Sequence, residues 1–108
     1  MILNEAIKTM TNEIVSILAG NKPTIYLFGS VALDDFKLGW SDIDVAVLTE
    51  REITEQQADI LVELRQAMLE RCPGNPYFRL FEGGMLSVDA FLNGKIERTV
   101  YWGRADSV

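Results

Sequence analysis

Histidine is absent from this chain, and cysteine occurs once, as Cys72. Disulfides within the chain are therefore excluded, and so is imidazole as a catalytic base or metal ligand. Long apolar runs are also missing, and the first residues lack the basic start and apolar block of a secretory signal. We therefore expect a soluble cytoplasmic protein without a membrane segment, in which acid–base chemistry falls to carboxylates.

Positive charge is scarce, since 10 Lys and Arg residues stand against 16 Asp and Glu and give a net charge of −6. Such a domain repels phosphate backbones, which disfavours nucleic acid as a partner. A nucleotide whose charge is masked by a divalent cation could still bind to a domain of this net charge. The 108 residues, 48% of them apolar, fit one domain over residues 1–108. We expect it to stand alone or to be the N-terminal part of a longer protein.

The first half of the chain predicts a helix and two strands. Apolar residues recur at intervals of three and four from Leu3 to Leu18, which is typical of an amphipathic helix. Residues 24–28 and 43–48 are β-branched, aromatic or aliphatic runs and predict buried strands. The second strand is uniformly apolar after Asp44, which predicts that both of its faces are covered.

The second half predicts a helix from a capping box at Thr54 and Gln57 to about Arg71. A third strand is expected at 77–82, with an extension to Leu86 left open, followed by a short helix between Ser87 and Gly94 and a last apolar piece at 100–102. This order predicts an α/β (α+β) fold, with helices flanking a small mixed sheet.

The segment between the first two strands combines a Gly-Ser turn with two carboxylates. Asp42 and Asp44 are two positions apart at a strand start, so both side chains point the same way, roughly 6.6 Å apart along the backbone. Hard divalent cations prefer such oxygen ligands. Gly29 lets phosphate oxygens approach backbone N–H groups, and Ser30 adds a hydroxyl donor. Both parts also have a purely structural interpretation. Asp42 and Asp44 fit a common strand-start motif, and Gly29 and Ser30 fit a turn with a helix cap.

These residues resemble the nucleotidyltransferase superfamily that includes DNA polymerase beta. Its signature is an apolar residue, Gly-Ser or Gly-Gly, about ten residues, and Asp-X-Asp; here Phe28-Gly29-Ser30 is followed, eleven residues later, by Asp42-Ile43-Asp44-Val45. The form Ser-Asp-Ile-Asp is similar to aminoglycoside nucleotidyltransferases and to minimal nucleotidyltransferases. The chain departs from many relatives at Leu33-Asp34, where they carry Arg-Gly.

The resemblance implies metal-dependent transfer of a nucleoside monophosphate, usually AMP from ATP, to an acceptor hydroxyl with release of pyrophosphate. Asp42 and Asp44 would hold two Mg²⁺ ions, and Gly29 and Ser30 would anchor the β- and γ-phosphates. The family uses a third carboxylate on a neighbouring strand. Glu82 is the preferred candidate, because an acid inside an apolar strand needs a partner; pairing with Arg79 or simple exposure would also explain it.

Asp89 is the alternative third carboxylate if the strand covers 85–91, although Ser87 makes it a first-turn helix acid instead. Three functions stay open. The first is an enzyme acting on a small molecule such as an aminoglycoside, alone or as a homodimer. The second is an antitoxin-type module that binds or adenylylates a helical partner protein. The third is a degenerate nucleotide-binding domain without turnover.

Overall fold

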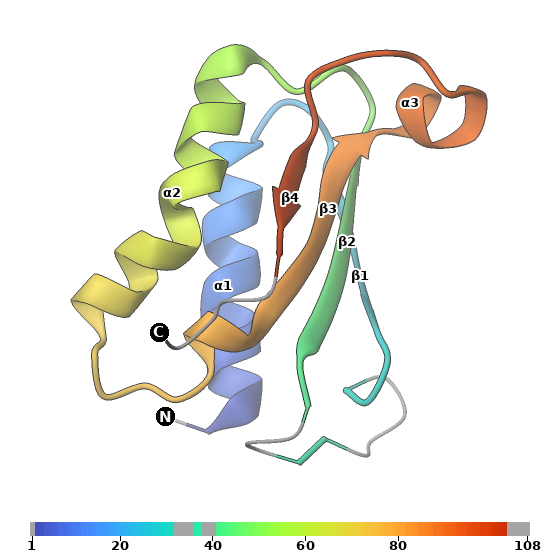
Figure 1. The fold of residues 1–108 in the computed structure, drawn as a ribbon. Coiled ribbons are helices and arrows are strands. Elements are labelled where there is room, and N and C mark those ends of the chain that lie inside the picture. Colours follow the sequence, from blue (N-terminus) through green and yellow to red (C-terminus); the bar gives the residue numbers. More distant parts are fainter. Residues whose placement is uncertain (1, 32–35, 38–40, 104–108) are drawn as a thin grey trace.

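The computed structural model describes residues 2–31, 36–37 and 41–103. Helices and strands are interspersed along this part of the chain, with β1 and β2 consecutive (Figure 1). In chain order the elements are α1 (Leu3–Ile17), β1 (Thr24–Phe28), β2 (Ile43–Thr49), α2 (Glu55–Arg71), the 3-10 helix η1 (Phe78–Leu80), β3 (Phe81–Ser87), α3 (Val88–Asn93) and β4 (Val100–Trp102).

The four strands form one mixed sheet in the order β1-β2-β3-β4. The pairing of β2 with β3 is parallel, and the two outer pairings are antiparallel. α2 lies in the connection between the two parallel strands, as a crossover between parallel strands requires. The fold class predicted from the sequence, a small mixed sheet flanked by helices, is confirmed.

Helices α1 and α2 lie side by side against one face of the sheet, which we call the inner face (Figure 1). The core between them is apolar and closed. It comprises Ala6, Met10, Ile14 and Leu18 at α1, Ala58, Leu61, Leu64 and Met68 of α2, and Ile43, Val45, Val47, Phe81, Met85, Val100 and Trp102 of the strands. None of the described helices is long and apolar enough to cross a membrane.

In the described part of the chain, α1 and α2 both cover the inner face, and the β2 residues on the opposite, outer face are only partly buried, which corrects the prediction that both faces of β2 are covered. Along β2, fully buried residues alternate with partly buried ones. On β1, Tyr26 and Phe28 are about half exposed, at 51% and 48%. Ala46 and Leu48 are apolar without being buried against a helix layer, so an uninterrupted apolar run does not by itself establish two covered faces.

The start of β3 also differs from the prediction. Residues 77–80 do not form a strand, because the Asn75 side chain accepts hydrogen bonds from the backbone N–H groups of Tyr77 and Phe78 and turns the chain. Phe78 is fully buried, and β3 begins only at Phe81. The side-chain caps were predicted correctly: Thr54 and Gln57 form the capping box of α2, and Ser87 caps α3.

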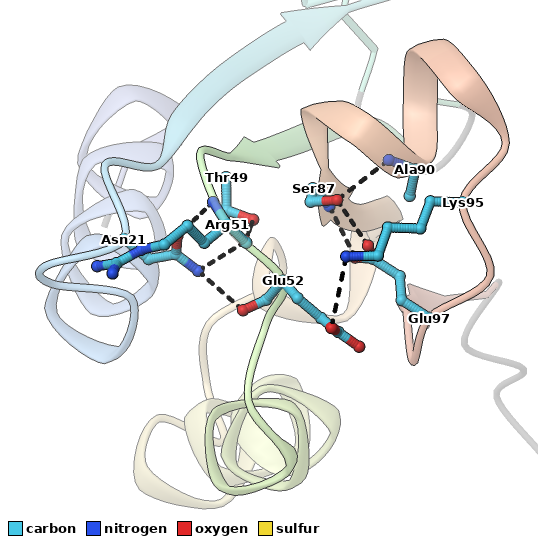
Figure 2. A network of polar contacts seen from close by, with 8 residues as sticks. All are labelled: Asn21, Thr49, Arg51, Glu52, Ser87, Ala90, Lys95 and Glu97. Carbon is cyan, nitrogen blue, oxygen red and sulfur yellow. Dashed lines mark hydrogen bonds and ion pairs between the residues drawn. The ribbon is translucent and has the colours of Figure 1, made fainter.

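A polar network fixes the end of the sheet at which Thr49 pairs with Ser87 (Figure 2). The Asn21 side chain donates to the carbonyl of Arg51 and accepts from its N–H group, and the Thr49 hydroxyl donates to the same carbonyl. Ser87 Oγ donates to Glu97 at 2.6 Å and accepts from the N–H of Ala90. All the polar atoms of these buried side chains have partners, which gives this end a structural role.

Candidate functional site

The candidate site lies at the opposite end of the sheet, where β1 ends and where β2 and β3 begin. Strand pairing places Phe28 opposite Asp44 and Asp44 opposite Glu82. All three residues are on the outer face, since the neighbouring Leu27, Val45 and Gly83 alternate to the inner one. We call this line of three residues across β1, β2 and β3 the Asp44 row.

Gly29 follows β1 in a turn and lies directly against Asp44. Its φ is +70°, a left-handed conformation that L side chains rarely adopt. A methyl group at this position would come within 2.3 Å of Asp44 Oδ2. The absence of a side chain at Gly29 therefore leaves the space that the Asp44 carboxylate occupies. The sequence does not reveal this role of Gly29. Ser30 is the next residue of the same turn and is partly buried.

The negative charge of Asp42 acts on the carboxylate of Asp44, two residues further along the chain. Asp42 lies one residue before β2, and both carboxylates are partly buried. Burial, and then the negative charge of Asp42, raise the pKa of Asp44 above its ordinary value of 3.8. A divalent cation between the two would relieve both effects, so this pair fits the donor set of Mg²⁺.

Glu82 lies in β3 next to Asp44, whereas Asp89 lies in the first turn of α3 beyond the far end of the strand. The Asp89 carboxylate accepts a hydrogen bond from Asn93 within its own helix. The structure thus brings Glu82 and not Asp89 to the Asp44 row. Among the described residues no three acidic or cysteine side chains are grouped closely enough to hold a metal ion. The roles of these residues therefore stay predictions.

Arg65 of α2 is a neighbour of this site that the sequence analysis does not single out. Its guanidinium donates to the carbonyls of Phe81 and Gly103, both at 2.6 Å, and lies 5.9 Å from the centre of the Trp102 ring. Burial lowers the pKa of Arg65, and the negative charge of Glu82 opposes that shift. The available signal was an arginine one turn after Leu61 and one turn before Met68, on the buried side of α2.

An apolar hollow of about 510 Å³ continues along the outer face from the Asp44 row toward α3. Its floor contains the small residues Ala46 and Gly84, which pair with each other, and Tyr26 lies opposite Ala46 on β1. The hollow is lined by Tyr26, Phe28, Val45, Ala46, Leu48, Gly84, Leu86 and Phe91. None of these side chains is charged.

Comparison with known proteins covers the part of this site formed by Gly29, Ser30, Asp42 and Asp44. None of the curated proteins and none of the solved structures matches the chain. A family model described as "Nucleotidyltransferase domain" matches residues 8–73. The match includes Gly29, Ser30, Asp42 and Asp44 and ends before Glu82; Leu33 and Asp34 lie outside the described residues. Because more than half of the chain is matched, it belongs to the nucleotidyltransferase domain family, whose general function is nucleotidyl transfer.

Proposed function

We propose that this protein is a Mg²⁺-dependent nucleotidyltransferase that moves AMP from ATP to an acceptor hydroxyl. One observation carries the proposal: the Asp44 carboxylate lies against the backbone of Gly29, beside Asp42 and opposite Glu82. The turn at Gly29 and Ser30 and the residues Asp42, Asp44 and Glu82 thus lie at one end of the sheet, which supports the proposal. A cytoplasmic location, where ATP is available, is part of this proposal.

Each residue has a defined task in this reaction. Asp42 and Asp44 hold Mg²⁺, and the backbone at Gly29 together with the Ser30 hydroxyl binds the β- and γ-phosphates. Bound Mg²⁺ supplies neutralisation of the charge that develops on the phosphates. The acceptor oxygen attacks the α-phosphorus in line, forms the new P–O bond and expels pyrophosphate. Glu82 is placed to accept the proton of the acceptor hydroxyl or to assist Asp44 in holding the metal.

Binding calorimetry tests the metal-dependent step without knowledge of the acceptor. We expect ATP to bind more tightly with Mg²⁺ than with a chelator, and Asp44→Asn to abolish this difference. The matched control is Asp89→Asn, which neutralises an acid outside the Asp44 row and should keep the difference. Equal ATP affinity with Mg²⁺ and with chelator would overturn the proposal.

A turnover assay separates Glu82 from Asp89. With a panel of aminoglycosides as acceptors, pyrophosphate release should be lost in Glu82→Gln and kept in Asp89→Asn. If only the Asp89 change matters, the assignment of the third carboxylate is wrong. Mg²⁺-dependent ATP binding without pyrophosphate release from any acceptor would instead identify a degenerate nucleotide-binding domain.

The apolar hollow favours a second candidate function, in which the domain binds a helical partner protein and adenylylates it or acts as its antitoxin. The face beside the Asp44 row is uncharged and partly exposed, with Tyr26 at 51% and Phe91 at 62% exposure. Amphipathic helices bind to such apolar surfaces through one face. The described residues that line the hollow offer no carboxylate to a polycationic aminoglycoside.

Coexpression with the protein encoded by the neighbouring gene, followed by size-exclusion chromatography, tests this candidate. We expect Tyr26→Ser and Phe91→Ser to weaken a complex that forms through the hollow. Val15→Ser removes an apolar side chain of similar exposure, 46%, from α1 and serves as the control. A complex that survives both hollow variants but not the control would place the interface elsewhere.

A further inference from the structure

Arg65 joins two strands at the edge of the sheet next to the candidate site. One nitrogen of its guanidinium donates to the carbonyl of Phe81 at the start of β3 and to that of Gly103 directly after β4. α2 packs against β4 on the inner side of the sheet (Figure 1), and the Arg65 side chain extends from α2 to these two carbonyls. Hydrogen bonds from a charged donor are about twice as strong as those between neutral groups.

The Phe81 carbonyl belongs to the peptide bond that joins Phe81 to Glu82. A donor fixed on this oxygen holds the peptide plane at the point where the Glu82 side chain leaves the backbone. Glu82 is also the first outer-face position of β3, so only one ladder position precedes it. Arg65 therefore acts on an end of β3 that pairs with β2 but not with β4.

The Arg65 guanidinium is itself held from two further sides. It lies over the Trp102 ring at 5.9 Å, and the ring nitrogen of Trp102 donates to the carbonyl of Leu61, one turn earlier in α2. Trp102 is only 2% exposed. The positive charge lies close enough to interact with Glu82. Partial burial, a stacked ring and two short hydrogen bonds restrict the side chain to one position.

We propose that Arg65 is a positioning residue for Glu82: through the Phe81 carbonyl it sets the Glu82 carboxylate beside Asp44, so that both bind the same Mg²⁺. This inference rests on the proposed function. The inference adds to the proposed site a residue on α2, outside the sheet, to which we assign no contact with nucleotide or metal.

Two other roles for Arg65 make different predictions. If Arg65 only ties α2 to the sheet, its loss lowers stability and leaves metal binding by the folded protein unchanged. If it is only a positive charge near the carboxylates, its removal strengthens Mg²⁺ binding, because a repulsive charge is lost. A positioning role predicts weaker Mg²⁺ binding despite the lost positive charge.

A double-mutant cycle on Arg65 and Glu82 tests the proposal. Calorimetry with a non-hydrolysable ATP analogue gives the ratio of affinities with Mg²⁺ and with chelator for the wild type, Arg65→Met, Glu82→Gln and the double variant. Each single change is expected to lower this ratio about tenfold, the lower end of the range for partners that orient metal ligands. The double variant should fall no further than Glu82→Gln, because both changes act through one carboxylate.

Trp102→Phe is the matched control, since it removes the indole N–H bond to α2 while keeping an aromatic ring under Arg65. It is expected to lower the melting temperature and leave the affinity ratio unchanged. Should Arg65→Met not fold, Arg65→Lys replaces it, because lysine keeps the charge without the planar guanidinium.

Any of the following results would overturn the proposal: independent, multiplied effects of Arg65→Met and Glu82→Gln, an affinity ratio that rises or stays the same in Arg65→Met, or an equal loss in Trp102→Phe. A ratio unaffected by Glu82→Gln would also overturn it. In that last case the proposed nucleotidyl transfer still stands or falls with Asp44→Asn, so the two failures are distinguishable.

Discussion

At the scale of single residues, the contact between Gly29 and Asp44 is the most restrictive feature of the site. Two separate requirements meet at Gly29, a left-handed backbone with φ +70° and the carboxylate oxygen that occupies the space of a side chain. A substitution therefore affects folding and ligand binding together.

We predict that Gly29→Ala destabilises the protein by more than about 1 kcal/mol and abolishes the Mg²⁺-dependent gain in ATP affinity. The methyl group would displace the Asp44 carboxylate, from which it would otherwise be only 2.3 Å away. Denaturant unfolding and calorimetry measure the two effects. Gly94→Ala is the control: its φ is similar, at +68°, but no atom lies within 4 Å of the added methyl group. It should cost about 1 kcal/mol and leave binding intact.

The raised pKa of Asp44 predicts a pH dependence of stability in the metal-free protein. Because burial and Asp42 raise this pKa above 3.8, the folded chain holds the proton more tightly than the unfolded chain does. The free energy of unfolding should therefore fall as the pH rises from about 3.8 through the raised value. Asp44→Asn should remove this part of the dependence and gain in stability relative to the wild type over the same window.

Unfolding curves recorded across that pH range in the presence of chelator measure the effect. Asp42→Asn removes the second cause of the shift and should move the window toward lower pH. Mg²⁺ competes with the proton at Asp44, so ATP affinity with Mg²⁺ should weaken as the pH falls through the raised pKa. A metal-free wild type whose stability rose across this window relative to Asp44→Asn would contradict the assignment.

At the scale of elements, the pairing of β2 with β3 leaves no room for a side chain at Gly83. A methyl group at Gly83 would lie 1.6 Å from the carbonyl oxygen of Val45, its partner in the parallel pairing. The φ of Gly83, +149°, is also one that L side chains rarely adopt. The pairing that aligns Asp44 with Glu82 thus depends on a glycine in the next position of β3.

We predict that Gly83→Ala destabilises the protein by more than about 3 kcal/mol, in the range of severe single substitutions. Gly84→Ala is a neighbouring control, because the nearest atom to its methyl group is 4.0 Å away. It should change stability by less than about 1 kcal/mol. Thermal unfolding compares the melting temperatures of the two variants. Similar values would contradict the lack of space for a side chain at Gly83.

The elements that the sequence predicts well are those specified by local chemistry. Side-chain caps at Thr54 and Ser87 fix the starts of two helices, and these caps act within three residues. The start of β3 was missed because Asn75 turns the following backbone and Phe78 is drawn into the core. The partial exposure of the outer face was not predicted. An apolar run shows only which residues a strand contains, whereas the burial of each face depends on where distant helices pack.

In the candidate site, too, the features that depend on local sequence could be predicted, and those that depend on contacts between separate elements could not. The spacing of Asp42 and Asp44 is local and predicts that both side chains point the same way, and the strand pattern predicts Glu82 on another strand. The role of Gly29 beside Asp44 and that of Arg65 beside Phe81 depend on contacts between separate elements. No periodicity in a single sequence encodes such contacts.

At the scale of the whole molecule, the two ends of the sheet have different characters. The end with Asn21, Thr49 and Ser87 is held by side-chain hydrogen bonds whose buried atoms are all satisfied (Figure 2). The end with Asp44 carries a carboxylate whose charge is disfavoured by its surroundings. The first end thus has the character of a structural element, and the second is the end to which the proposed function assigns ligand binding.

We predict that Mg²⁺ and ATP together raise the melting temperature, because ligand binding at the Asp44 end stabilises only the folded chain. At a free ligand concentration about 100 times the dissociation constant, the expected gain is about 2.7 kcal/mol. Differential scanning fluorimetry with ATP and either Mg²⁺ or chelator measures it, and Asp44→Asn provides the control. An equal shift in that variant would place the nucleotide elsewhere.

The parallel alignment of Asp44 with Glu82 also has a consequence for the order of folding. β1 and β2 can pair early, but β3 can join β2 only after the crossover through α2 has been traversed, and such long-range parallel pairing is slow. The carboxylates of the Asp44 row therefore come together late in folding. A chain released before that step would contain Asp42, Asp44 and Gly29 and still lack the complete row, so nucleotide binding at full affinity would report that folding has finished.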